Sequence, residues 1–196
     1  PIAQTKDVLL MENKKNGLQE FLATLSPVPC DGTVGAAVMN CNPFTKGHRY
    51  LIETAAKECD RLYVFVLSED KSYFSTEDRM AMVQLGVADL PNVEVDSSSE
   101  LLADYAKRRG SCVIVKGLRA GSDFENEFQM ALINHKINQE LDTVFLTAEH
   151  QFTYLSSSMV KELAFYNVEL SGFLPDAIIP DVQKRIYELR QGGNPK

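Results

Sequence analysis

The sequence predicts an α/β protein with an open, five-stranded parallel sheet and helices on both faces. Short runs of β-branched and other apolar residues alternate with segments whose apolar residues recur at a helical period. Because each run is followed by a helical segment, the pattern is that of parallel strands joined by helical crossovers. The predicted strands are "VGAAVM", "RLYVFVL", "NVEV", "CVIV" and "TVFL".

The helices are placed by apolar spacing and by cap residues. The first begins after residue 47 and has one small or apolar face, formed by Leu51, Ile52, Ala55 and Ala56. A second begins near Thr76, a suitable N-cap that is followed by two acidic residues, which the helix dipole favours there. A third is expected over residues 123–140, and a closing helix over 175–190.

Residues 1–32 differ from the rest of the chain. They contain one short amphipathic segment, "LQEFLATL", between polar stretches, and they end in "SPVP". We expect an N-terminal helical extension or linker outside the sheet, followed by a single domain over residues 33–196. The chain begins at Pro1 without a methionine, so we also expect a processed chain or a piece of a longer one.

Composition limits the partners and the compartment. The 27 acidic and 20 basic residues give a net charge of −7, which argues against general nucleic-acid binding. No apolar run approaches the roughly 18 residues of a membrane span, and no signal peptide is evident. The four cysteines form no C-x-x-C pair, so core thiols are favoured over disulfides or zinc ligands. We therefore expect a cytoplasmic protein with no membrane partner.

The first polar cluster is "MNCNPFTKGH", where the first strand gives way to the first helix. In an open parallel sheet, ligands bind beyond the carboxyl ends of the strands, where helix N-termini offer free N–H groups. His48 there can donate to a phosphate oxygen, Thr45 can supply a hydroxyl, and Gly47 lets a ligand approach the backbone. The alternative is a tight turn that happens to contain a histidine.

A second cluster lies in "VIVKGLRAGSDFENEFQMALIN", at the end of a predicted buried strand. Lys116 and Arg119 flank Gly117 and can clamp a phosphate or carboxylate, Arg119 with bidentate geometry. The alternative is an ordinary surface pairing with Asp123 or Glu125.

The third cluster is "YLSSSMVKEL", just before a predicted helix. Ser156, Ser157 and Ser158 offer a cap and free N–H groups for an anion, or they act only as an ordinary helix cap. Three phosphate-binding patterns at the strand ends of one sheet together favour a nucleotide site.

Four segments, in this order and spacing, resemble the nucleotidyltransferases with an HxGH-type motif: "TKGH", "VKGLRAGSDFENEFQMALIN", "ELDTVFL" and "YLSSSMVKEL". The chain is most similar to the bacterial phosphopantetheine adenylyltransferase family; the resemblance runs over residues 33–188 and is close over residues 92–175. The resemblance implies a Rossmann-like fold of the nucleotidyltransferase type and a homo-oligomer. It also implies transfer of AMP from ATP to 4′-phosphopantetheine, with Mg²⁺, giving dephospho-CoA and pyrophosphate.

The resemblance implies a role for each matching position. The catalytic residues would be His48, Lys71 and Arg119. The nucleotide site would consist of Thr45, Gly47, His48, Gly117, Arg119, Glu127, Ser156, Ser157 and Ser158. The acceptor side would consist of Asn40, Lys71, Leu101, Leu102, Lys116 and Asn134. No residue is assigned as a metal ligand.

Some positions depart from that family. Asn40 and Asn42 stand where it usually has a hydroxyl residue and an acid, and Lys116 stands where it has an arginine. Ser98 and Glu100 replace a common phenylalanine and glycine.

Residues 1–80 resemble another branch of the superfamily, the acetate ligase that activates citrate lyase. The likeness lies in "ENKKNGLQEFLATL", "MNCNPFTKGHRYLIE" and "LSEDKSYFSTEDR". It implies adenylation of acetate and acetylation of a carrier-bound thiol. Because the C-terminal half matches through more consecutive site positions, we expect phosphopantetheine as acceptor, with acetate as the alternative. A non-catalytic protein that binds ATP or CoA is a second alternative.

Neither reaction needs an enzyme nucleophile, because an oxygen of the acceptor attacks the α-phosphorus directly. We expect His48 to donate to a phosphate rather than act as a base, since a phosphate acceptor is already ionised near pH 7. Cys41 adjoins the site and is read as a small buried side chain, with a reactive thiol as the alternative. His135 and His150 are expected to have no catalytic part.

Overall fold

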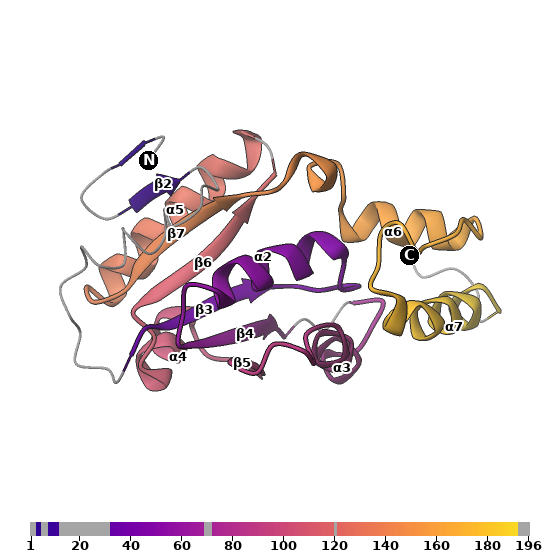
Figure 1. Cartoon of the computed structure of the whole chain (residues 1–196), viewed down its shortest axis with the longest axis horizontal. Coiled ribbons are helices and arrows are strands. Elements are labelled where there is room, and N and C mark those ends of the chain that lie inside the picture. The colour runs from indigo at the N-terminus through magenta and orange to yellow at the C-terminus, as the bar shows by residue number, and fades with distance from the viewer. Residues whose placement is uncertain (1–2, 5–7, 12–31, 69–71, 120, 192–196) are drawn as a thin grey trace.

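The computed structural model describes residues 3–4, 8–11, 32–68, 72–119 and 121–191 of the chain (Figure 1). Its strands are β1 (Ala3–Gln4), β2 (Val8–Met11), β3 (Val34–Met39), β4 (Arg61–Leu67), β5 (Val93–Ser98), β6 (Val113–Leu118) and β7 (Asp142–Thr147). They form one seven-stranded sheet in the order β1-β2-β7-β6-β3-β4-β5.

The five predicted strands are confirmed as β3 to β7, and neighbours among them pair in parallel. β6 continues past its apolar run to Leu118, because Lys116 and Gly117 still pair with β7. The apolar run marks only the first, continuously buried part of this strand. The extension carries the strand directly into the polar segment that contains Arg119.

Part of the N-terminal segment joins the sheet, which differs from the expected extension outside it. β2 pairs in parallel with β7, in the register Val8↔Thr143, and β1 pairs with β2 in antiparallel fashion. The physical reason is that β7 would otherwise present an unpaired backbone edge. The helix predicted over "LQEFLATL" lies outside the described residues and stays a prediction.

The helices are α2 (Lys46–Ala56), α3 (Thr76–Gly86), α4 (Leu102–Arg109), α5 (Gly121–Ile137), α6 (Ser157–Phe165) and α7 (Ile179–Gln191), with 3₁₀ turns at His150–Phe152 and Asp176–Ile178. The N-cap of α3 is Ser75, whereas the sequence suggested Thr76; the Ser75 hydroxyl accepts from the Asp78 N–H, and the Asp78 carboxylate accepts from the Ser75 N–H. Within the described ranges, no helix is long and apolar enough to cross a membrane.

Helices cover both faces of the sheet, as predicted (Figure 1). Successive residues of β3 point to opposite faces. Ala37 and Met39 join the core beneath α2 and α3, whereas Val38 joins a second cluster with Tyr105 of α4. Phe145 packs on the face that α5 covers. Neighbouring residues of β3 thus belong to different core clusters, because side chains along a strand alternate between the two faces of the sheet.

β3 and β6 are neighbours in the sheet, and the chain leaves them in opposite directions along it. From β3 the chain passes through α2 to β4, whereas β6 is followed by α5 and then β7 on the other side. The register Ala37↔Val115 brings the carboxyl ends of the two strands side by side. Such a switch in strand order is where open α/β sheets bind ligands.

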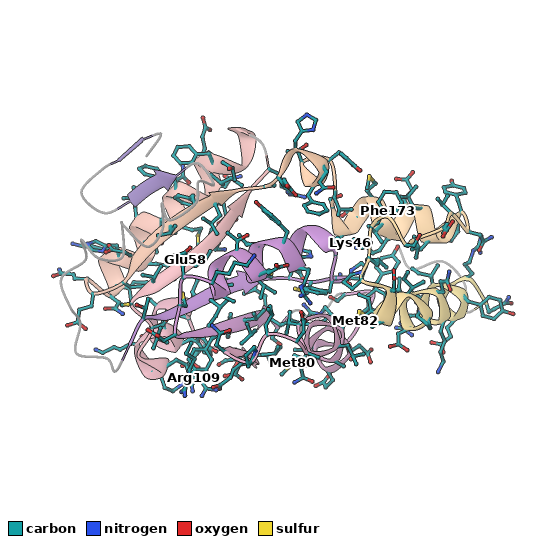
Figure 2. The ribbon with its side chains drawn as sticks, viewed as in Figure 1. Lys46, Glu58, Met80, Met82, Arg109 and Phe173 are labelled. Atoms are coloured by element: carbon teal, nitrogen blue, oxygen red, sulfur yellow. The ribbon has the colours of Figure 1, made fainter. Side chains whose placement is uncertain are left out.

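α6 and α7 lie together beyond one end of the sheet (Figure 1). The loop between them holds the start of α2, because the Lys46 N–H donates to the Phe173 carbonyl at 2.9 Å (Figure 2). The Lys46 ammonium also donates to the Ser171 carbonyl. These bonds fix the helix turn that carries His48.

Candidate functional site

A cavity of about 430 Å³ opens at the switch between β3 and β6, against the first turns of α2 and α6. The three polar clusters of the sequence meet in its wall. The predicted site residues that line it are Asn40, Thr45, Gly47, His48, Lys116, Gly117, Arg119, Glu127, Ser156, Ser157 and Ser158.

The segment "TKGH" forms the capped start of α2. The Thr45 hydroxyl accepts from the His48 N–H at 3.3 Å, and His48 Nδ1 accepts from the Thr45 N–H at 3.0 Å. The Phe44 ring stacks on the imidazole at 5.9 Å between centroids. Because Nδ1 is an acceptor here, the neutral ring carries its proton on Nε2. His48 can therefore donate a hydrogen bond, whereas its only lone pair is already used.

Burial and the nearby Arg119 guanidinium lower the pKa of His48 to about 4, although the ring stays partly accessible from the cavity. The imidazole is therefore neutral near pH 7. A neutral donor beside an arginine suits a site for phosphate oxygens better than a proton-abstracting base does.

This pKa has a consequence for stability. An unfolded chain protonates His48 near pH 6.5, whereas the folded chain does so only near pH 4. The free energy of unfolding should therefore fall between pH 7 and pH 5 by about 1 to 2 kcal/mol because of this residue. Urea unfolding of the parent and of His48→Gln at both pH values measures it. An identical pH dependence in the two proteins would contradict a neutral His48.

Lys116 and Glu127 form an ion pair in the cavity, with 3.2 Å between Nζ and Oε2. The sequence offered Asp123 or Glu125 as the alternative partner of the cations; the structure shows Glu127 as a partner of Lys116, and the side chain of Asp123 lies outside the described part of the chain. Lys116 comes from the end of β6 and Glu127 from α5, and the Lys116 side chain is only 18% exposed. A negatively charged ligand that approaches Lys116 must therefore compete with a carboxylate.

Gly117 has a packing role besides lining the cavity. A Cβ at this position would lie 3.1 Å from Cδ2 of Leu51, so the glycine lets β6 pack closely against α2. At Gly47, an added Cβ would meet its nearest protein atoms only at 3.6 Å, an ordinary contact distance. The fold therefore has room for a methyl group at residue 47, and that group would occupy the cavity wall.

Two of the three serines at the start of α6 use their hydroxyls to hold the structure. Ser156 is the N-cap and accepts from the Met159 N–H at 3.1 Å. The Ser157 hydroxyl donates to the Pro43 carbonyl at 2.8 Å, which ties α6 to the loop before α2. Ordinary capping, the alternative interpretation, therefore applies to Ser156. The first backbone N–H groups of α6 still stand at the cavity, where they can bind an anion.

Three predicted acceptor-side residues do not line this cavity. Leu101 is the N-cap of α4 and is 62% exposed, Leu102 packs against the core cluster under α4, and Asn134 is buried on α5. Lys71 lies outside the described residues. The roles assigned to these four positions stay predictions.

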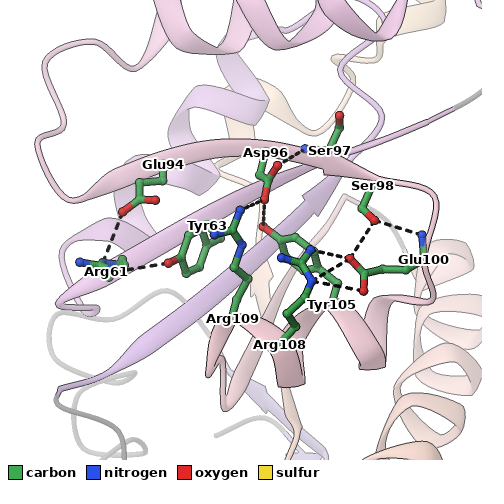
Figure 3. Close-up of polar contacts among 10 residues, drawn as sticks. All are labelled: Arg61, Tyr63, Glu94, Asp96, Ser97, Ser98, Glu100, Tyr105, Arg108 and Arg109. Atoms are coloured by element: carbon green, nitrogen blue, oxygen red, sulfur yellow. Dashed lines mark hydrogen bonds and ion pairs between the residues drawn. The ribbon is translucent and has the colours of Figure 1, made fainter.

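The departures at Ser98 and Glu100 belong to one polar network at the end of β5 (Figure 3). The Ser98 hydroxyl and the Arg108 guanidinium both donate to Glu100, and the hydrogen bond from Arg108 lowers the pKa of Glu100. Beside it, in a second group of polar contacts, the Arg109 guanidinium donates to Asp96. The serine and the glutamate at these two positions therefore contact each other.

Other side chains near the motifs have structural surroundings. Cys41 is fully buried, and burial raises the pKa of its thiol far above the ordinary value, which fits a buried side chain better than a reactive thiol. His135 Nδ1 lies 3.1 Å from the Leu141 carbonyl oxygen. Neither His135 nor His150 lines the cavity.

Sequence reasoning missed Arg79, which is fully buried on α3 and contacts Asn40. A signal was present: Arg79 shares the inward stripe of α3 with Met82, Val83 and Gly86, at helical spacing. A charged residue at a core position of an amphipathic helix requires buried partners.

Comparison with known proteins is consistent with this architecture. A family model, "Citrate lyase ligase C-terminal domain", matches residues 34–183. The phosphopantetheine adenylyltransferase of Clostridium botulinum (strain 657 / Type Ba4) is 45% identical over 152 residues, which cover 76% of this chain and 93% of the relative. That of Clostridium perfringens (strain 13 / Type A) is 42% identical over 162 residues, covering 82% and 99%.

A solved structure shares the fold. It is a Vibrio parahaemolyticus protein provisionally assigned as a nicotinate-nucleotide adenylyltransferase, with a TM-score of 0.57, 15% identity, and coverage of 80% of this chain and 92% of that one. The structural match and the sequence matches agree with the resemblance in the motifs. The chain belongs to the phosphopantetheine adenylyltransferase family and carries the citrate lyase ligase C-terminal domain.

Proposed function

We propose that the chain is a nucleotidyltransferase that transfers AMP from ATP to 4′-phosphopantetheine, giving dephospho-CoA and pyrophosphate. The observation that carries the proposal is the cavity at the strand switch, where His48, Arg119 and the first turn of α6 converge. Relatives that are 42 to 45% identical are named for this reaction.

The reaction needs charge stabilisation and orientation from the protein. A phosphate oxygen of the acceptor attacks the α-phosphorus, an O–P bond forms, and the bond to the leaving pyrophosphate breaks. Negative charge on the phosphoryl oxygens would be met by Nε2–H of His48, by Arg119 and by the N–H groups at the start of α6. These donors stand in place before the substrates bind, so little reorganisation is needed.

Mg²⁺ would enter with the triphosphate. Among the residues that the structure describes, no cluster of three His, Cys, Asp or Glu side chains could hold a metal. Mg²⁺ is commonly held by substrate phosphates with only one or two carboxylates, and Glu127 is a carboxylate in the cavity wall. We also retain a homo-oligomeric state and a cytoplasmic location as proposals.

Adenylation of acetate is the second candidate. It is favoured by the match to the citrate lyase ligase C-terminal domain and by Asn40 in the cavity wall, where the adenylyltransferase family usually has a hydroxyl residue. Acetate would leave the cation of Lys116 without a dianionic partner, so we place phosphopantetheine first.

Release of pyrophosphate from ATP tests the function. With phosphopantetheine present the chain should release pyrophosphate and form dephospho-CoA, and with acetate it should release little. Faster pyrophosphate release with acetate than with phosphopantetheine would make acetate adenylation the first candidate function. Binding of ATP without release in either mixture would indicate the non-catalytic alternative.

Gly47→Ala separates binding from folding. The added methyl group meets the protein only at contact distance, so the free energy of unfolding should change by less than about 1 kcal/mol. The same group lies in the cavity wall, so the KM for ATP should rise by roughly tenfold or more. Unfolding curves and initial rates measure the two effects. An unchanged KM would mean that the nucleotide does not pass close to residue 47.

A further inference from the structure

The Phe44 ring is a direct neighbour of the His48 imidazole. The two rings are nearly parallel, with an interplanar angle of 14° and 5.9 Å between their centroids. Phe44 is fully buried and belongs to the core cluster beneath α2 and α3, whereas His48 reaches the cavity. The phenyl ring therefore lies on the core side of the imidazole and connects the core to the cavity wall.

The hydrogen bond to His48 does not by itself fix the direction in which the imidazole points. Nδ1 accepts from the Thr45 N–H at 3.0 Å, which holds the ring at one atom and leaves it able to tilt about that bond. A flat partner on one face prevents tilting toward that face. Phe44 can act as this partner because a close-packed interior lets a large ring move little. The two contacts together set the direction of Nε2–H.

Gly86, the last residue of α3, leaves the space that the Phe44 ring occupies. A Cβ built on Gly86 would lie 2.4 Å from Cε1 and 2.8 Å from Cδ1 of Phe44, distances that a real side chain does not tolerate. Alanine is otherwise favoured over glycine in a helix. The lack of a side chain at this position is therefore required by the phenyl ring.

Arg49, the residue after His48, holds Gly86 in place. Its guanidinium donates to the Gly86 carbonyl and, through two bonds of 2.7 Å, to the carboxylate of Asp89. These bonds join the first turns of α2 to the end of α3, beside the stacked rings. Gly86 therefore cannot withdraw from the phenyl ring without breaking them.

We propose that Phe44 and Gly86 are positioning residues: Gly86 admits the phenyl ring, and the ring holds the His48 imidazole so that Nε2–H points into the cavity. The inference rests on the proposed nucleotidyl transfer, in which that N–H donates to a phosphoryl oxygen. It extends the functional residues from the cavity wall to the end of α3, a helix that does not itself line the cavity.

Phe44→Leu tests the support of the imidazole. Leucine keeps much of the apolar volume but has no flat face, so the imidazole should become more mobile and less buried. Burial is the main cause that lowers the pKa of His48 to about 4, so that pKa should rise toward the ordinary value of 6.5. The kcat for pyrophosphate release should fall by roughly tenfold, with a smaller change in the KM for ATP. NMR titration of isotope-labelled histidine and initial rates measure the two effects.

Phe65→Leu is the matched control. Phe65 is also buried, but it packs against Tyr105 on the opposite face of the sheet, with 4.3 Å between ring centroids. The same substitution there should lower stability to a similar extent and leave the His48 signals and kcat unchanged. A general loosening of the fold would instead change both variants alike, which would contradict a specific role of Phe44.

Gly86→Ala tests the space for the ring. The added methyl group must displace the Phe44 ring, so kcat and the midpoint of urea unfolding should both fall. In Phe44→Leu the ring edge is absent, so adding Gly86→Ala there should lower kcat no further. An equal additional loss of kcat in both backgrounds would overturn the role of Gly86, because the alanine would then act independently of residue 44.

The imidazole signals separate this inference from the proposed function. If neither phosphopantetheine nor acetate reacts, the proposed function fails, and the NMR titration still decides whether Phe44 holds His48. A pKa and tautomer of His48 equal to those of the parent in folded Phe44→Leu would overturn the inference, whatever the rates. A raised pKa with an unchanged kcat, in a chain that turns over either acceptor, would also overturn it.

Discussion

Replacement of His48 by alanine is expected to lower kcat for pyrophosphate release by roughly 100-fold or more while the chain remains folded. The side chain offers Nε2–H to the cavity, because Nδ1 already accepts from the Thr45 N–H. Its pKa of about 4 keeps it neutral, so its contribution is a fixed donor rather than proton transfer. A donor that acts on charge developed in the transition state affects kcat more than KM.

The second role of His48, as part of the cap of α2, needs its own control. His48→Ala removes the acceptor for the Thr45 N–H and should cost about 1 kcal/mol of stability. His48→Asn can still accept that hydrogen bond through its shorter side chain but does not carry a donor as far into the cavity. Both variants should be slow, whereas only the alanine variant should lose stability. Near-normal turnover by a folded His48→Asn variant would contradict the catalytic role of His48.

The sequence was sufficient for the strands because their apolar runs are short and well separated. The runs in β3, β4, β6 and β7 mark residues that are mostly buried between two helical layers, and such burial leaves a continuous apolar signal. The run "NVEV" lies in the edge strand β5, which is only partly buried. β2 was missed because it is only four residues long and because its position is set by pairing with the edge of β7. Edge pairing depends on the partner strand and therefore leaves little trace in the local sequence.

The sequence could predict those site residues whose position is set by the backbone alone. Thr45, His48 and Arg119 follow strand ends, Lys116 lies near the end of β6, and the order of strands brings those ends together. The pairing of Lys116 with Glu127 was not predictable, because it depends on the direction in which α5 leaves the sheet.

The Asn40–Arg79 contact was missed for a related reason. It joins residues 39 positions apart through a side chain that looks like an ordinary helix surface charge. A contact of this kind depends on how α3 packs against the strand ends, so it is visible only in three dimensions.

Lys116→Ala is expected to weaken phosphopantetheine binding by about 1.5 to 3 kcal/mol, the range for hydrogen bonds to charged groups. Part of the loss would come from Glu127. In the parent the ammonium lies 3.2 Å from this carboxylate, so removing Lys116 leaves a negative charge in the cavity without that partner. An approaching phosphate dianion would then meet repulsion as well as a missing cation.

A second substitution distinguishes these two contributions. In Lys116→Ala combined with Glu127→Gln, the carboxylate is gone, and phosphopantetheine affinity should recover in part relative to Lys116→Ala alone. Lys116→Arg keeps the cation and should bind nearly as well as the parent, since an arginine is usual in the adenylyltransferase family at this position.

Calorimetric titration of the four proteins with phosphopantetheine, and then with acetate, measures each step. Acetate affinity should change much less than phosphopantetheine affinity, because a single carboxylate gains less from the cation than a dianion does. If the parent binds acetate but no phosphopantetheine, then Lys116 serves another ligand and the acetate ligase activity takes first place.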